Sequence, residues 1–234
     1  MTSLKKIYSE VSMLKIAKAD NSLSVSIVDH PLVRESLRFM RDKKSDKESF
    51  RNAVHRLSPI LIYAATTDLD EKKLVIETPL AQIESQELYD HIVLIPVLRS
   101  GIGMHDSAEN IFPRATTIFA GMARDEATSI PHWYYDLKFL EILGDGIGAT
   151  FLVLDPMLAT GGSAIETIKR IKDIYPKGKI KMISMIASPE GVRALNTVYP
   201  DVSITVAAVD DHLNDKYYIV PGLGDAGDRQ FGTT

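Results

Sequence analysis

Short, continuous runs of apolar residues are separated along this chain by longer polar stretches. A strand that is apolar at every position is typical of a parallel sheet covered on both faces, because a strand with one solvated face would alternate instead. The runs are residues 74–76, 92–95, 116–119, 151–154, 180–187 and 202–209. Their alternation with helical stretches predicts an α/β fold with a mostly parallel central sheet flanked by helices.

Two further patterns extend this prediction towards the N-terminus. Residues 23–27 alternate Leu, Val and Ile with serines, as in a half-buried strand, and a helical region begins near His30. After Phe50 an apolar stripe at helical spacing predicts an amphipathic helix with Val54, Leu57, Ile60, Leu61 and Ala64 on one face. Because no repeat or linker divides the chain, residues 1–234 are expected to form one domain, with residues 1–30 as an N-terminal extension.

The composition excludes several classes of protein. There is no cysteine, so disulfides, thiolate catalysis and zinc–thiolate sites are ruled out. The net charge of −4 at pH 7 disfavours general nucleic-acid binding. No apolar run approaches the ~18 residues of a spanning helix, and the first residues lack a signal-peptide core. The sequence therefore predicts a cytoplasmic protein with no nucleic-acid or membrane partner.

The most specific motif begins where the run 151–154 ends. Asp155 follows directly, and a Thr-Gly-Gly-Ser turn at residues 160–163 opens a helical stretch. The first amides of a helix lack internal partners and carry partial positive charge, and two glycines let the main chain wrap closely around an anion. The motif therefore predicts a phosphate site, with Asp155 facing neutral hydroxyl groups beside it. An ordinary glycine-rich turn capped by Ser163 is the alternative.

Two arginines stand after other predicted strands. Arg99 follows the run 92–95 in the segment Pro-Val-Leu-Arg-Ser-Gly, and Arg124 follows the run 116–119 in the segment Arg-Asp-Glu. A guanidinium group suits a phosphate because its planar fork makes paired, charge-assisted hydrogen bonds. Taken alone, each arginine is more typical of a solvated surface charge.

The segment 218–232 is rich in glycine and aspartate. Segments close to a chain end are more often polar and poorly ordered, and a loose tail is the alternative interpretation. Small side chains let main-chain donors and acceptors reach the edge of a flat ligand. The composition of this segment therefore favours a binding role.

Together these segments resemble the uracil phosphoribosyltransferases, a branch of the type I phosphoribosyltransferases. Residues 155–163, Asp-Pro-Met-Leu-Ala-Thr-Gly-Gly-Ser, are similar to the family's loop for phosphoribosyl pyrophosphate. Residues 98–101 are similar to its Leu-Arg-(Ala/Ser)-Gly loop and residues 124–126 to its Arg-Asp-Glu segment. Residues 218–232 are similar to its uracil-binding hood, and the likeness runs from about His30 to Phe231.

The resemblance implies a fold, a reaction and a set of site residues. The fold is that of type I phosphoribosyltransferases, with a flexible flap at residues 122–140 and a hood at residues 210–232. The reaction moves the 5-phosphoribosyl group from phosphoribosyl pyrophosphate to uracil N1, giving UMP and pyrophosphate, as in pyrimidine salvage. The implied donor-binding residues are Arg99, Arg124, Asp155, Pro156, Met157, Leu158, Ala159, Thr160, Gly161, Gly162, Ser163 and Asp225. The implied uracil-binding residues are Ile219, Gly224, Asp225 and Ala226, and the implied catalytic residues are Arg99, Arg124 and Asp225.

Further properties follow from the same resemblance. Mg²⁺ is expected to be held mainly through the pyrophosphate of the substrate, with no metal site made by protein residues alone. The family forms homodimers or homotetramers, and GTP is an effector of some members. The flap departs from the family's Tyr-Tyr-x-Lys-Leu-Pro pattern, so Tyr134, Tyr135 and Lys138 receive no role. No residue is assigned as general base.

Two other functions stay open. A phosphoribosyltransferase for another base, such as a purine, would use the loop 155–163 equally well but fits the segment 218–232 badly. A regulator that binds UMP or RNA would share the fold, although the acidic pI of 5.9 and the lack of a basic–aromatic strip disfavour it.

Overall fold

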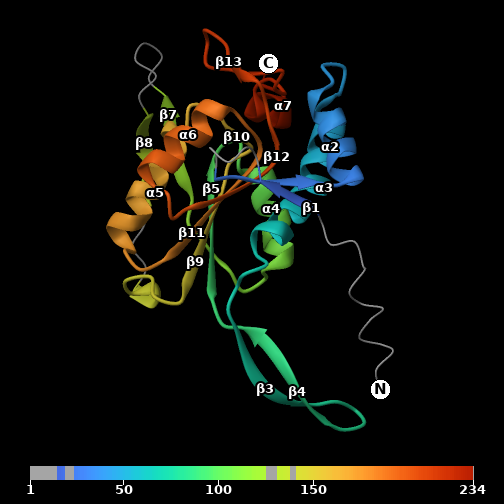
Figure 1. The fold of residues 1–234 in the computed structure, drawn as a ribbon, viewed down its shortest axis with the longest axis vertical. Helices are drawn as coiled ribbons and strands as arrows, with labels where there is room; N and C mark the ends of the chain where they lie inside the picture. Colours follow the sequence, from blue (N-terminus) through green and yellow to red (C-terminus); the bar gives the residue numbers. More distant parts are fainter. Residues whose placement is uncertain (1–14, 19–23, 125–130, 138–140, 234) are drawn as a thin grey trace.

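The computed structural model describes residues 15–18, 24–124, 131–137 and 141–233. Figure 1 shows one twisted sheet with helices on both of its faces and a hairpin that projects away from it. The strand order is β1-β2-β12-β11-β9-β5-β7-β8, and the pairs are parallel except β1–β2 and β7–β8. The predicted α/β fold with a mostly parallel central sheet is confirmed.

The strands along this order are β1 (Lys15–Lys18), β2 (Ser26–Asp29), β12 (Ser203–Val209), β11 (Lys179–Ala187), β9 (Ala149–Leu154), β5 (His91–Leu98), β7 (Ala120–Arg124) and β8 (Pro131–Tyr135). Two short strands, β6 (Thr116–Thr117) and β10 (Met157–Leu158), pair with β5 and β11. The helices are α2 (Pro31–Arg41), α3 (Lys47–Ala65), α4 (Ile102–Ile111), α5 (Gly162–Ile174), α6 (Pro189–Val198) and α7 (Ala226–Phe231), with a 3-10 turn η1 (Glu141–Leu143). None of the helices in the described part of the chain is long and apolar enough to cross a membrane.

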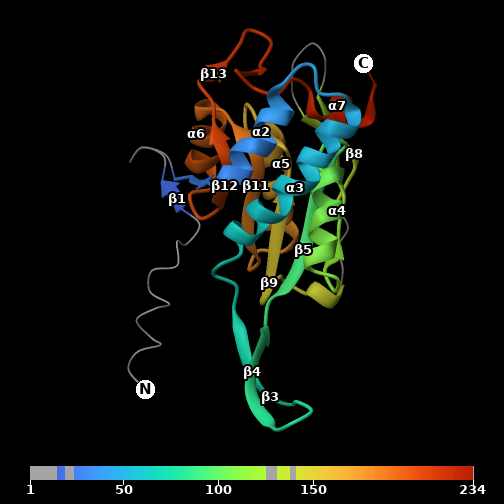
Figure 2. The ribbon, with the colours of Figure 1, turned by 90° about the vertical axis from the view of Figure 1, so that its right-hand side faces the viewer.

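Strand β9 shows why the central strands are apolar at every position. Phe151 and Val153 pack in the core beneath α5 and α6, whereas Leu152 and Leu154 pack in the core beneath α2, α3 and α4. All four side chains are fully buried. Figure 2 shows α2, α3 and α4 together on one side of the sheet. Because successive side chains of a strand point to opposite faces, a strand between two helical layers has no solvated position.

The amphipathic helix predicted after Phe50 is confirmed as the C-terminal part of α3. Val54, Leu57, Leu61 and Ala64 are buried against the sheet. The helix begins at the N-cap Asp46, whose carboxylate accepts a hydrogen bond from the Ser49 amide at 2.8 Å. This backbone hydrogen bond lowers the pKa of Asp46.

The apolar run 74–76 is not a buried strand of the central sheet, and that prediction is wrong. It lies in β3 (Glu71–Glu77), which pairs only with β4 (Gln82–Leu88) in an antiparallel hairpin. Val75 is 69% exposed, and the two lysines just before the run form cross-strand ion pairs with β4, Lys72–Glu87 and Lys73–Glu84. Three apolar residues between charged neighbours are too few to define a strand with two buried faces.

Ion pairs hold the root of this hairpin against the sheet, at the end away from the hairpin tip. Lys181 Nζ lies 2.5 Å from Asp68 Oδ1, and Lys179 Nζ lies 2.6 Å from Asp70 Oδ2. The hydrogen bond to Asp70 raises the pKa of Lys179. Both lysines come from β11, so the hairpin is fixed to the centre of the sheet.

Two predicted strands differ in detail. The run 116–119 is split, since β6 ends at Thr117 and β7 begins only at Ala120. Pro96 of β5 lies opposite this break, and proline has no amide hydrogen to donate to a neighbouring strand. The strand predicted at 23–27 begins only at Ser26 and buries Val28. Of the predicted extension and flap, residues 1–14, 19–23, 125–130 and 138–140 lie outside the described residues.

Candidate active site

A cavity of about 780 Å³ lies at the carboxyl ends of β5 and β9. Its walls come from three segments that are far apart in the sequence, residues 97–100, 155–163 and 216–227, and from Met122 of β7. Ligands of open α/β sheets bind at this edge, outside the carboxyl ends of the strands. The predicted phosphate loop and the predicted hood therefore share one cavity.

The loop after β9 leaves main-chain amides available at the start of α5. Gly161 has a left-handed backbone (φ 82°), a conformation that favours glycine, and it is the N-cap of α5. Among the described residues, no side chain caps this helix, and Thr160 Oγ1 accepts a hydrogen bond from the Gly162 amide at 3.3 Å. The positive N-terminal end of α5 can therefore hold a phosphate.

Ser163 lies in the first turn of α5 and lines the cavity, so it is not the N-cap. The alternative of an ordinary turn capped by Ser163 is wrong. Asp155, at the start of the loop, is 8% exposed and accepts a hydrogen bond from Ser100 Oγ at 3.2 Å. The carboxylate is thus fixed beside the loop that follows β5.

Arg99 extends from the end of β5 towards α7. The peptide bond between Leu98 and Arg99 is cis, and Arg99 Nη2 lies 3.3 Å from Asp228 Oδ1. The guanidinium side chain is 56% exposed and lines the cavity, so it is accessible to a ligand bound there.

The backbone beside Arg99 is packed without spare room. A Cβ atom on Gly101 would lie 2.4 Å from the Leu154 carbonyl oxygen, and Gln230 Nε2 donates to the Ser100 carbonyl at 2.9 Å. The Arg99 loop is therefore fixed between β9 and α7.

The hood begins with the antiparallel pair β13 (His212–Leu213) and β14 (Ile219–Val220) and ends with α7. Asp225 is the N-cap of α7, and its Oδ1 accepts a hydrogen bond from the Asp228 amide at 2.9 Å. Ile219 and Asp225 line the cavity, whereas Ala226 is fully buried behind it. The hood therefore presents a carboxylate, an apolar side chain and glycine backbone to one space.

A buried ion pair holds the hood on α2. Arg41 donates to both carboxylate oxygens of Asp210, at 2.8 and 2.6 Å, and to the Gly222 carbonyl at 2.9 Å. Asp210 also accepts a hydrogen bond from the Gly222 amide at 2.9 Å. The side chain of Asp210 is 4% exposed, so Arg41 compensates a charge that is removed from water.

Arg229 makes a second attachment. Its guanidinium donates to the carbonyl oxygens of Met40, Asp42 and Leu223, and it lies 4.5 Å from the ring centre of Phe50. Burial lowers the pKa of Arg229 from its usual value, although an arginine stays charged at any physiological pH. The end of α2, the start of α3 and the hood are thus joined by one side chain.

A family model described as uracil phosphoribosyltransferase matches residues 27–233. This chain belongs to that family. It is 46% identical over 209 residues to the uracil phosphoribosyltransferase of Roseiflexus castenholzii, covering 89% of this chain and 98% of the relative. It is 44% identical over 207 residues to that of Malacoplasma penetrans, covering 88% and 98%.

Solved structures agree on the fold. The structure of the AQ2163 protein from Aquifex aeolicus matches with a TM-score of 0.82 and 33% identity, over 90% of this chain and 99% of that one. The adenine phosphoribosyltransferase of Trypanosoma brucei matches with a TM-score of 0.52 and 9% identity, over 87% and 90%. At that identity the likeness concerns the fold alone.

The structure brings together much of the site that was expected from the family. The expected site residues that line the cavity are Arg99, Asp155, Met157, Ala159, Ser163, Ile219 and Asp225. Those that form its supporting backbone and do not line it are Pro156, Leu158, Thr160, Gly161, Gly162, Gly224 and Ala226. The side chain of Arg124 lies outside the described residues, so its expected role stays a prediction.

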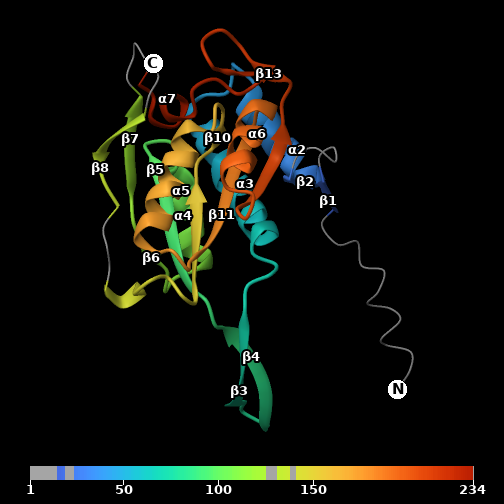
Figure 3. The same cartoon turned by 60° about the vertical axis from the view of Figure 1, so that its left-hand side comes forward.

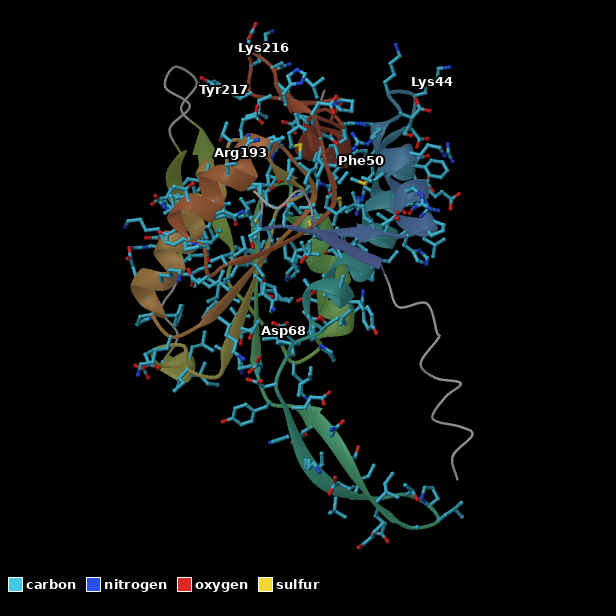
Figure 4. All side chains as sticks on the ribbon, in the orientation of Figure 1. Lys44, Phe50, Asp68, Arg193, Lys216 and Tyr217 are labelled. Carbon is cyan, nitrogen blue, oxygen red and sulfur yellow. The ribbon has the colours of Figure 1, made fainter. Side chains whose placement is uncertain are left out.

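Part of the cavity wall was not expected from the sequence. Lys216, Tyr217 and Tyr218 line the cavity, and Figure 4 shows Lys216 and Tyr217 at the same end of the molecule, opposite Asp68 at the hairpin root. The side-chain oxygen of Asn214 accepts hydrogen bonds from the Lys216 and Tyr218 amides at 3.0 Å each, and Tyr217 has a positive φ of 61°. Asparagine favours such turns, so the turn itself was detectable, but its position over the cavity was not.

Strand β8, which lies within the predicted flap, is anchored on α5. Trp133 Nε1 donates to Glu166 at 3.2 Å, and Arg170 Nε donates to Asp136 at 2.9 Å. The hydrogen bond from Arg170 lowers the pKa of Asp136. Tyr134 and Tyr135 are largely exposed, and neither lines the cavity.

Proposed function

We propose that this protein transfers the 5-phosphoribosyl group of phosphoribosyl pyrophosphate to N1 of uracil, giving UMP and pyrophosphate. The observation that carries the proposal is the single cavity shared by the loop 155–163 and the hood. A transfer reaction needs donor and acceptor in contact, and family membership identifies the two ligands. The reaction makes the protein a pentosyltransferase of pyrimidine salvage.

The donor would bind along the carboxyl edge of the sheet. The backbone of residues 159–163 would hold the 5-phosphate at the uncapped start of α5, and Asp155 would accept hydrogen bonds from the ribose hydroxyls. Asp155 is already oriented by Ser100, so little conformational freedom is lost when the sugar binds.

Arg99 would stabilise the leaving pyrophosphate, and the family pattern gives Arg124 the same task. Negative charge grows on the leaving group as its bond to C1 breaks, while the ribose becomes oxocarbenium-like. A guanidinium group held in place beforehand stabilises that state more than the ground state. The tight packing of Gly101 against the Leu154 carbonyl fixes the backbone from which this side chain extends.

Uracil would bind to the hood on the opposite side of the ribose. Ile219 lines the cavity and supplies an apolar contact. The family pattern assigns the donors and acceptors on the base edge to main-chain groups of Gly224, Asp225 and Ala226, of which Asp225 lines the cavity. Gly224 has a left-handed backbone (φ 77°), so this stretch can turn its peptide groups inward.

Mg²⁺ fits this site as a companion of the donor. Asp155 and Asp225 line the same cavity, and the described residues include no group of three or more His, Asp or Glu side chains that could hold a metal. Mg²⁺ is commonly held by one or two carboxylates together with substrate phosphates. The bound ion would neutralise charge on the pyrophosphate, and Asp155 and Asp225 are the side chains that would hold it.

The test is a pyrophosphate-release assay with Mg²⁺, phosphoribosyl pyrophosphate and a panel of bases. We expect release with uracil and no release with adenine, guanine or hypoxanthine. Release with a purine would favour a phosphoribosyltransferase for purine bases. Absence of release, together with salt-dependent retention of RNA, would favour a regulator.

Replacing Asp225 with asparagine is expected to lower kcat/KM for uracil roughly 10- to 100-fold, because one charged contact in the transition state is lost. Asparagine is as good an N-cap as aspartate, so α7 keeps its first turn and the melting temperature should stay within about 2 °C of the parent. Steady-state kinetics of the two proteins check this, and full-rate turnover by the variant would remove Asp225 from the proposed role.

We also propose that the protein forms homodimers or homotetramers, with GTP as an effector. The projecting hairpin supports association, because Val75, Leu80 and Ile83 are 69%, 96% and 48% exposed, and an apolar arm of this kind suits a second copy of the chain. Replacing Val75 and Ile83 with glutamate is expected to shift sedimentation velocity towards the monomer, whereas Lys73→Gln should leave the assembly unchanged. A parent protein that sediments as a monomer at micromolar concentration would contradict association.

The GTP effector is supported by the family resemblance alone. The pyrophosphate-release assay, run with and without GTP, tests it.

A further inference from the structure

The first turn of α6 contacts the phosphate loop through a fully buried serine. Ser188 is 0% exposed and is the N-cap of α6. Its hydroxyl donates to the Ala159 carbonyl at 2.6 Å and accepts a hydrogen bond from the Gly191 amide at 2.9 Å. Its own amide donates to the Leu158 carbonyl at 2.9 Å. One residue therefore caps α6 and donates hydrogen bonds to two consecutive carbonyl groups of the loop.

The two backbones at this contact touch directly. A Cβ atom on Gly191 would lie 2.2 Å from the Ala159 oxygen and 2.7 Å from the Leu158 oxygen. A Cβ atom on Gly161 would lie 3.1 Å from the Gly191 oxygen. Because these glycines have no side chain, the two backbones are in direct contact. A shift of α6 would therefore move the loop backbone as well.

The same turn of α6 also contacts the hood. Glu190 Oε1 accepts a hydrogen bond from the Leu213 amide at 3.2 Å. Leu213 pairs directly with Ile219, which lines the cavity. Hydrogen bonds from its own amide and from the Leu213 amide lower the pKa of Glu190. Figure 3 shows α6 directly beneath β13.

We propose that Ser188 and Glu190 are positioning residues for the two substrates, Ser188 for the loop that holds the sugar donor and Glu190 for the strand that holds the base. Neither side chain lines the cavity, so each acts through backbone that does. The first turn of α6 thus fixes the spacing between donor and acceptor. This inference rests on the proposed function.

The test for Ser188 compares Ser188→Ala with Ser188→Thr. Alanine removes the hydrogen bond to the Ala159 carbonyl, and we expect the KM for phosphoribosyl pyrophosphate to rise roughly tenfold while the KM for uracil changes less than about twofold. Threonine keeps the hydroxyl and should restore the KM for the donor. Equal increases in both KM values, or no difference between the two variants, would overturn the role of Ser188.

The test for Glu190 compares Glu190→Ala with Glu190→Gln. Alanine removes the acceptor for the Leu213 amide, and we expect the KM for uracil to rise about 3- to 10-fold with little change in the KM for the donor. Glutamine keeps an acceptor oxygen and should behave like the parent. An unchanged KM for uracil in the alanine variant would overturn the role of Glu190.

Failure of the proposed function and failure of the role of α6 give different results. A parent protein that forms no UMP contradicts the proposed function. A parent that forms UMP, with alanine variants that show no split between the two KM values, contradicts only the inference about α6. Thermal unfolding of all four variants is the control, because general loosening would lower the melting temperature and move both KM values together.

Discussion

Arg99→Ala is expected to lower kcat/KM for UMP formation by roughly 10- to 1,000-fold, the usual loss when one charge-assisted contact to a transition state is removed. Arg99 is 56% exposed within the cavity wall and its described ion pair is a long one, 3.3 Å to Asp228. The fold therefore depends little on this side chain, and its loss should be seen in catalysis.

Arg99→Lys is the matched variant. Lysine keeps the positive charge but lacks the planar fork that makes paired bonds to phosphate oxygens, so an intermediate loss is expected. Melting temperatures within about 2 °C of the parent would show that both variants keep the fold. Unchanged steady-state kinetics of the alanine variant would remove Arg99 from the proposed role.

Arg41→Ala is expected to destabilise the protein by roughly 2–4 kcal/mol, which corresponds to a fall of about 5–15 °C in melting temperature for a chain of this size. The variant leaves Asp210 charged and 4% exposed without its partner. Breaking a fully buried pair costs roughly 3–5 kcal/mol, and the lower range applies here because Arg41 is itself 25% exposed.

Two further variants make this result specific. Arg34→Ala, on the same helix, removes an ion pair with Asp29 that is more than half exposed on both sides, and less than about 1 kcal/mol should be lost. Adding Asp210→Asn to Arg41→Ala removes the uncompensated charge and should recover part of the stability. A melting temperature for Arg41→Ala equal to that for Arg34→Ala would show that the buried pair does not hold the hood.

The central strands could be predicted from the sequence because their pattern follows from burial alone. A strand such as β9, with Phe151 and Leu152 on opposite faces and both buried, has to be apolar at successive positions. The hairpin β3–β4 could not be recognised in the same way. Its apolar residues, such as Val75, are exposed in the single chain, so burial does not explain them.

The phosphate loop was predictable because its function depends on local backbone geometry, which Gly161 and Gly162 make visible in the sequence. The side chains that attach the hood to the rest of the fold could not be predicted in this way. Arg41 and Asp210 are 169 residues apart, and a charged residue near a helix end usually means an exposed one. Likewise, nothing in the local sequence indicates that the turn containing Lys216 and Tyr217 reaches the cavity.

The strand order also has a consequence for how the molecule assembles. Strands β9, β11 and β12 are neighbours in the sheet in the same order as in the chain, with α5 and α6 as their crossovers. Strand β2, by contrast, pairs with β12 although most of the chain separates them. Contacts between distant residues cost more chain entropy and form more slowly. We therefore expect a refolding molecule to acquire the cradle for the sugar phosphate early, and to gain the pocket for the base only after the N-terminal helices have docked.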